Sequence, residues 1–192
     1  MARYVALLRG LNVGGHRVKM ARLRGLFEEL GFDDVTTLIA SGNVMFSTAS
    51  GDLEALCGRI EQHLAHGLGY EVATFIRSPQ ELESIAAFGD STADREPSGS
   101  TPSPSSLYVF FLPAAADDAL RARIADLRSE MDEFAFAGRE IFWRIQGKMS
   151  ESPLFGGGLE KAIRGVPTTM RNMTTVRRLI EKLRTADVDG SE

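Results

Sequence analysis

The residues that decide the fold stand at the start of the chain, where residues 3–19 read RYVALLRGLNVGGHRVK. An apolar run that is typical of a buried strand passes at once into a loop with glycines and several cations. Met20, Leu23, Phe27 and Leu30 then follow at helical spacing, which predicts an amphipathic helix. This layout suits anion binding, because glycines let backbone N–H groups approach a ligand and a helix N-terminus carries partial positive charge.

The next segments predict the rest of a ferredoxin-like half. Strands are expected at residues 35–40, 44–46 and 72–76, with turn residues between the first two. An apolar stripe that begins at Leu53 predicts a helix before the last of these strands. The order to residue 76 is therefore β-α-β-β-α-β, in which the first strand lies next to the second strand of the hairpin.

A segment without periodicity separates this half from the rest of the chain. Residues 98–106 contain only Ser, Gly, Thr and Pro, so we expect residues 91–105 to form a mobile linker. Beyond it the predicted order is β-α-β-β, followed by helices, which is a modified copy of the first half. The predicted fold class is α+β. The expected domains are a ferredoxin-like half at 1–77, a connecting helix and linker at 78–106, and a modified ferredoxin-like half with C-terminal helices at 107–192.

Composition limits the chemistry that the chain can carry. The 192 residues include one cysteine, Cys57, so neither an internal disulfide nor a cysteine-based metal cluster is possible within the chain. Neither a signal peptide nor an apolar run of bilayer-spanning length is visible. We therefore expect a cytoplasmic protein with no membrane partner, no metal site and no cofactor.

The charges are distributed unevenly along the chain, whose net charge is −4. Residues 1–24 carry six Lys or Arg and no acid, and residues 161–184 carry seven Lys or Arg against Glu181 alone. Two interpretations stay open: the basic ends share one positive surface, or they are two separate solvated helix faces.

Topology points to one edge of the first sheet as a site. In a β-α-β-β-α-β unit the first two strands run parallel, so the loop after the first and the turn after the second open on the same edge. An Arg before the last helix is a further candidate clamp for an anion, and we expect it to lie near Arg9. The alternative is that the glycines only permit turns and the asparagines only cap backbone groups. The candidate ligand-binding residues are Arg9, Asn12, Gly14, Gly15, Lys19, Ser41, Asn43, Arg171 and Asn172.

Three segments together resemble the bacterial domain-of-unknown-function family 1697. They are LRGLNVGG at residues 8–15, SGNV at 41–44 and RNMTTV at 171–176. In the third, Met173 stands where the family commonly has a Trp. The resemblance implies an α+β fold of two ferredoxin-like parts and places the candidate residues within the family's signature, but it implies no activity.

The sequence predicts a binding function and no recognisable reaction. We expect a small anionic ligand, either a nucleotide or a phosphorylated metabolite, at the glycine-rich loop. No catalytic residue is predicted, and neither enzymatic activity nor oligomeric state follows from the sequence. Two alternatives stay open: a nucleic-acid-binding module that uses the basic N- and C-terminal segments, or a protein-interaction domain whose exposed strand edges pair.

Overall fold

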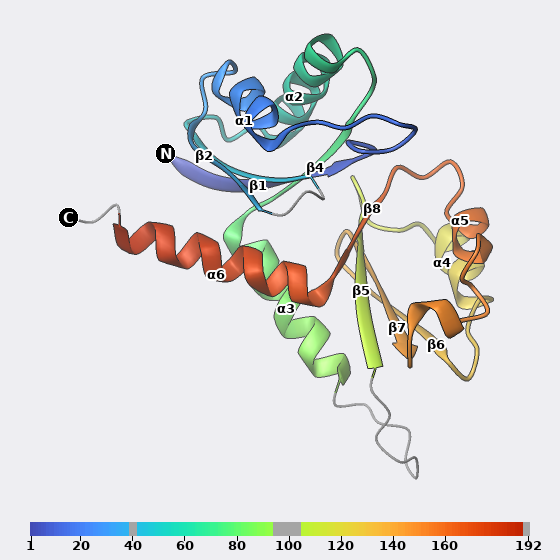
Figure 1. Cartoon of the computed structure of the whole chain (residues 1–192). Helices are drawn as coiled ribbons and strands as arrows, with labels where there is room; N and C mark the ends of the chain where they lie inside the picture. Colours follow the sequence, from blue (N-terminus) through green and yellow to red (C-terminus); the bar gives the residue numbers. More distant parts are fainter. Residues whose placement is uncertain (39–41, 94–104, 190–192) are drawn as a thin grey trace. The chain divides into compact units, whose positions relative to one another are not determined.

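The computed structural model describes residues 1–38, 42–93 and 105–189 (Figure 1). The chain divides into two compact units. The first unit comprises Met1–Leu82 and Leu179–Glu192, and the second comprises Glu83–Arg178. Each unit contains one four-stranded sheet in which all neighbouring strands are antiparallel.

The first unit is a complete ferredoxin-like fold. Its sheet has the strand order β2-β3-β1-β4. The first strand pairs with the second strand of the hairpin, as the sequence predicts. The elements are β1 (Ala2–Arg9), α1 (Met20–Glu28), β2 (Asp33–Leu38), β3 (Asn43–Thr48), α2 (Leu53–Leu68) and β4 (Ala73–Arg77).

Both helices of this unit bury their apolar stripes against one face of the sheet, in a core that includes Leu23, Phe46 and Ile60. Gly69 ends α2 in a left-handed conformation with φ 81°. Gly67 lies inside the helix. A Cβ there would come within 2.4 Å of a methyl of Leu26, so this glycine allows α1 and α2 to approach closely.

The second unit repeats the same topology, with the strand order β6-β7-β5-β8. The sequence predicts only three of its strands, with helices alone after the third. Residues 169–172 instead form the fourth strand, which is too short to show a periodic pattern. The elements are β5 (Ser105–Phe111), α4 (Asp118–Ala125), β6 (Asp132–Ala137), β7 (Glu140–Gln146), the 3₁₀ helix η1 (Met149–Glu151), α5 (Gly158–Ala162) and β8 (Thr169–Asn172).

A further helix follows the fourth strand of each sheet directly: α3 (Pro79–Ala93) follows β4, and α6 (Met173–Asp189) follows β8. A capping box begins α3, because the Ser78 N–H donates to Glu81 Oε2 at 2.8 Å and the Glu81 N–H donates to Ser78 Oγ at 3.2 Å. Most of the predicted linker, residues 94–104, lies outside the described residues. Within the described ranges, no helix combines the length and the apolar character that a membrane span requires.

Candidate functional site

The loop that follows β1 meets the turn between β2 and β3, as the parallel course of β1 and β2 requires. The Leu8 N–H donates to the Gly42 carbonyl at 2.8 Å. Gly42 has φ +73°, and a Cβ on it would lie only 3.1 Å from Leu8 Cβ. The turn therefore depends on glycine, both for its backbone conformation and for its close approach to β1.

Hydrogen bonds hold the loop in one conformation. Asn12 Oδ1 accepts from the Val18 N–H at 2.9 Å, which closes the loop across its base. The Tyr70 hydroxyl donates to the Leu11 carbonyl at 2.7 Å, and the Tyr70 ring stacks on His16 with centroids 3.9 Å apart. Burial raises the pKa of Tyr70, which keeps its hydroxyl protonated as a donor.

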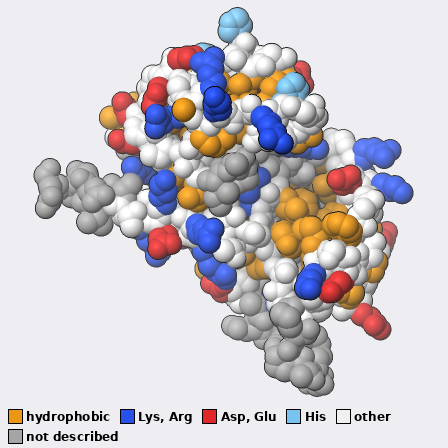
Figure 2. Space-filling model, in the orientation of Figure 1, with side chains coloured by type: hydrophobic (Ala, Val, Ile, Leu, Met, Phe, Trp, Pro, Cys, Tyr) orange, Lys and Arg blue, Asp and Glu red, His pale blue; other side chains and the backbone are white. Residues whose placement is uncertain are grey.

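Three exposed cations border this loop: Arg9 where β1 ends, and Arg17 and Lys19 just before α1. In the described part of the chain none of the three has a partner in an ion pair. By contrast, Arg22 and Arg24 of α1 pair with acidic residues of the same helix region, at 2.8 and 3.4 Å. The loop thus combines free positive charge with two glycines of positive φ, Gly14 at 66° and Gly15 at 89°. Lys and Arg side chains also stand out from the surface of the first unit in Figure 2, with His side chains near them.

The predicted asparagines have structural partners. Asn43 is fully buried, and its Nδ2 donates to the Leu38 carbonyl at 3.0 Å across the hairpin. Asn12 closes the loop as described above. Both asparagines therefore bind backbone groups, and the exposed predicted residues of this unit are Arg9, Asn12, Gly14, Gly15 and Lys19. Ser41 lies outside the described residues.

The remaining two predicted residues belong to the second unit. Arg171 is 7% exposed, and its Nη1 donates to Thr169 Oγ1 at 2.7 Å and to the Met170 carbonyl at 2.8 Å. Burial lowers the pKa of Arg171 to about 10. Asn172 and Thr174 are both residue types that favour an N-cap, and Asn172 caps α6, with Oδ1 accepting from the Thr175 N–H at 2.8 Å. That Arg171 lies near Arg9 stays a prediction.

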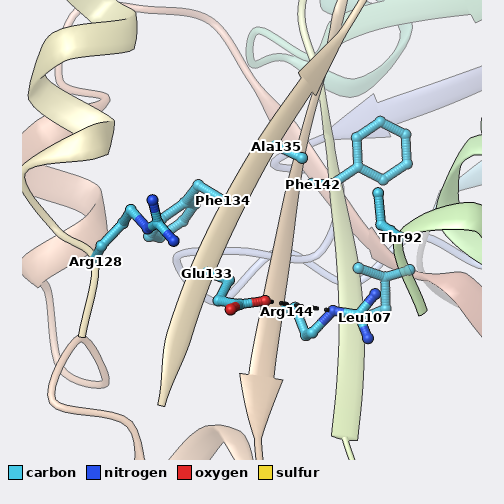
Figure 3. A pocket seen from close by; sticks show the side chains of 8 residues that line it. All are labelled: Thr92, Leu107, Arg128, Glu133, Phe134, Ala135, Phe142 and Arg144. Carbon is cyan, nitrogen blue, oxygen red and sulfur yellow. Dashed lines mark ion pairs between the residues drawn. The ribbon is translucent and has the colours of Figure 1, made fainter. Parts of the chain in front are cut away.

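Sequence reasoning missed a cavity on the sheet of the second unit. Its volume is about 240 Å³, and it contains the buried Arg144 beside Glu133 (Figure 3). A signal was present in the sequence, since Gly138 between two short apolar runs indicates a hairpin, and that hairpin places Glu133 directly opposite Arg144. The lining residues are Thr92, Leu107, Arg128, Glu133, Phe134, Ala135, Phe142 and Arg144.

This architecture defines an α+β protein built from two ferredoxin-like units. Over residues 1–142 the sequence matches the family described as "Protein of unknown function (DUF1697)", and the chain belongs to that family. The solved structure of the conserved bacterial protein SP0830 from Streptococcus pneumoniae is similar, with a TM-score of 0.72 and 25% sequence identity over 96% of this chain and 99% of that chain. No curated protein matches the sequence. The resemblance that the three segments predict is thereby confirmed.

Proposed function

We propose that the loop of residues 9–19 binds a small anion, such as the phosphate of a nucleotide or of a phosphorylated metabolite, in the cytoplasm. The observation that carries this proposal is the set of three exposed cations at the loop, with no acidic partner among the described residues. The first acidic residue in the sequence is Glu28, near the end of α1. The loop and the start of α1 therefore contribute positive charge and no carboxylate of their own.

Backbone donors add to this charge. Positive φ at Gly14 and Gly15 puts the backbone in a conformation that lets successive N–H groups point to one side. At the N-terminus of α1, Lys19 occupies the cap position, and no described side chain caps the helix there. The first N–H groups of this nine-residue helix are thus free to donate to a ligand.

A prearranged loop lowers the cost of binding. The hydrogen bonds of Asn12, Gly42 and Tyr70 fix the loop before a ligand arrives, so little conformational entropy is lost on binding. The two predicted asparagines accordingly act as positioning residues, and direct contact with the anion falls to Arg9, Lys19 and the glycine N–H groups.

Titration of the full chain with inorganic phosphate, pyrophosphate and ATP, followed by calorimetry, tests the proposal. Arg9→Ala should weaken anion binding by about 1.5–3 kcal/mol, the value of a hydrogen bond to a charged group. Arg24→Ala removes the same charge from α1, where Arg24 already pairs with Glu28, and should leave the affinity unchanged within a factor of two. If Arg9→Ala lowers the melting temperature and leaves the affinity alone, Arg9 supports the fold and the proposal is wrong.

Nucleic-acid binding is the alternative that the basic ends raise. Ferredoxin-like domains that bind RNA stack bases on the sheet face opposite their helices. In the second unit this face is occupied, because Phe142 is 2% exposed and packs against Phe88 of α3 with ring centroids 4.7 Å apart. This burial favours the small anion as ligand. An electrophoretic shift assay at two salt concentrations separates the two, since salt-sensitive retention of an oligonucleotide would support the alternative.

A further inference from the structure

A second site lies in the second unit, on the sheet face away from α4 and α5. Alternate residues of β5 and β7, such as Phe110 and Trp143, enter the core beneath these helices. Leu107, Phe142 and Arg144 therefore point to the opposite face. There α3 packs on the sheet, and a Cβ on its Gly89 would meet Leu107 at 3.1 Å. Thr92, near the end of α3, borders the cavity of about 240 Å³ that the helix leaves uncovered on this face (Figure 3).

The walls of the cavity are divided between apolar and charged groups. Leu107, Ala135 and Phe142 supply an apolar floor, since they come from three neighbouring strands of the sheet. Arg144 and Glu133 point toward each other across the cavity, whereas Arg128 lies beyond the edge strand β6 (Figure 3). Among the described lining residues, two are cations and one is a carboxylate.

The ion pair inside the cavity is loose. Arg144 is 7% exposed, and its Nε lies 3.9 Å from Glu133 Oε2, which is too long for a hydrogen bond. The Glu133 side chain is 39% exposed, so it can turn to solvent at little cost. A buried guanidinium gains most from a planar acceptor that makes two parallel hydrogen bonds, and a carboxylate has that geometry.

We propose that this cavity binds a small carboxylate with a short apolar body. The carboxylate lies on Arg144 and displaces Glu133 toward solvent, while the apolar body rests on Leu107, Ala135 and Phe142. The volume lies just below the range of about 300–1,000 Å³ for drug-sized ligands, so the ligand is small. This site is separate from the loop at Arg9 and does not depend on the function proposed there.

Benzoate is a suitable probe, and benzamide is its neutral counterpart of nearly the same shape. In an NMR titration of the full chain, benzoate should shift the amide signals of β6 and β7, and benzamide should bind at least tenfold more weakly. Glu133→Gln should tighten benzoate binding several-fold, because a competing carboxylate is removed. Arg144→Gln should abolish it.

Two further variants keep the test decisive if Arg144→Gln does not fold. Ala135→Leu fills the cavity and retains Arg144, so it should abolish benzoate binding. Ala137→Leu makes the same change two residues along β6, on the same face but outside the cavity lining, and should retain binding. Equal affinity for benzoate and benzamide, or benzoate binding that survives Ala135→Leu, overturns the inference. Loss of benzoate binding in Arg9→Ala also overturns it, since that result would place the carboxylate at the loop of the first unit.

Discussion

Arg77 and Arg171 occupy equivalent positions in the two units. Arg77 stands in β4 opposite Val5 of β1, and Arg171 stands in β8 opposite Val109 of β5. In each case Nη1 donates to the carbonyl of the preceding residue at 2.8 Å. Both arginines are buried, at 1% and 7% exposure. The last strand of each sheet thus carries a buried arginine that donates to the carbonyl of the residue before it.

The equivalence continues beyond the two arginines. The next residue in each unit, Ser78 or Asn172, caps the following helix by accepting from the N–H three residues on. The repeated unit is therefore β-α-β-β-α-β-α, with the third helix beginning directly after the buried arginine. Each arginine anchors the junction between the last strand and that helix.

Truncation of either arginine should destabilise the protein by about 2–4 kcal/mol, because buried hydrogen bonds are lost and a cavity remains. The expected result for Arg77→Ala and Arg171→Ala is a lower midpoint in urea unfolding. Arg24→Ala, on an exposed helix face, should change the unfolding free energy by less than about 1 kcal/mol. A change at Arg171 as small as that at Arg24 would mean that the guanidinium does not anchor the junction.

Asp132 organises a buried network in the second unit. Its carboxylate is fully buried and accepts from Trp143 Nε1 at 2.8 Å, from Ser152 Oγ at 2.7 Å and from Ser129 Oγ at 2.8 Å. Asp132→Ala leaves these donors without an acceptor and should cost about 2–4 kcal/mol of unfolding free energy. Asp126→Ala, at an exposed position before β6, is the matched control. Chemical denaturation followed by Trp143 fluorescence measures both, and equal midpoints for the two variants would contradict this role.

Local signals made most of the fold predictable. The apolar periodicity of α2 and the Ser78–Glu81 capping box are contained within a few residues, so the pattern alone locates them. The strand β8 could not be found in this way, because four residues carry no periodicity and their pairing with β5 is a long-range contact. The role of Gly67 was missed for the same reason, since it depends on Leu26 of another helix.

The neighbourhood of the glycine loop and the hairpin turn was predictable, whereas the contacts of the individual side chains were not. Parallel β1 and β2 require the loop and the turn to share an edge, and the Leu8–Gly42 hydrogen bond bears this out. Whether Asn12 contacts a ligand or the backbone depends on where Val18 lies, which no spacing rule reveals. The cavity at Arg144 depends on how much of the sheet α3 covers, and helix packing of that kind is not encoded in a local motif.

Gly42 should be far less tolerant of substitution than Gly10, although both have positive φ, at 73° and 81°. An alanine at either position is strained in the left-handed backbone conformation, which costs about 1 kcal/mol. Gly42→Ala also places a methyl 3.1 Å from Leu8 Cβ, whereas nothing lies within 4 Å of a Cβ at Gly10. Gly42→Ala should therefore lower the unfolding free energy by about 1–2 kcal/mol more than Gly10→Ala. Equal losses in thermal unfolding would mean that the turn can move away from β1.

Tyr70→Phe removes the hydroxyl that donates to Leu11 and so tests what holds the glycine loop. At pH 8 the variant should lose about 0.5–1.5 kcal/mol of unfolding free energy, the value of one hydrogen bond. It should also bind phosphate more weakly, because the loop is no longer fixed.

The pH dependence of that difference gives a second, independent check. Burial raises the pKa of Tyr70 in the folded protein above its ordinary value of about 10. The stabilisation from the protonated hydroxyl is complete below pH 10, and it is lost as the pH rises through the folded pKa, because the unfolded chain ionises first. The stability difference between the parent protein and Tyr70→Phe should therefore shrink between pH 8 and pH 11 in urea titrations. A difference that stays constant over this range would show that the Tyr70 hydroxyl is not held as a buried donor to the loop.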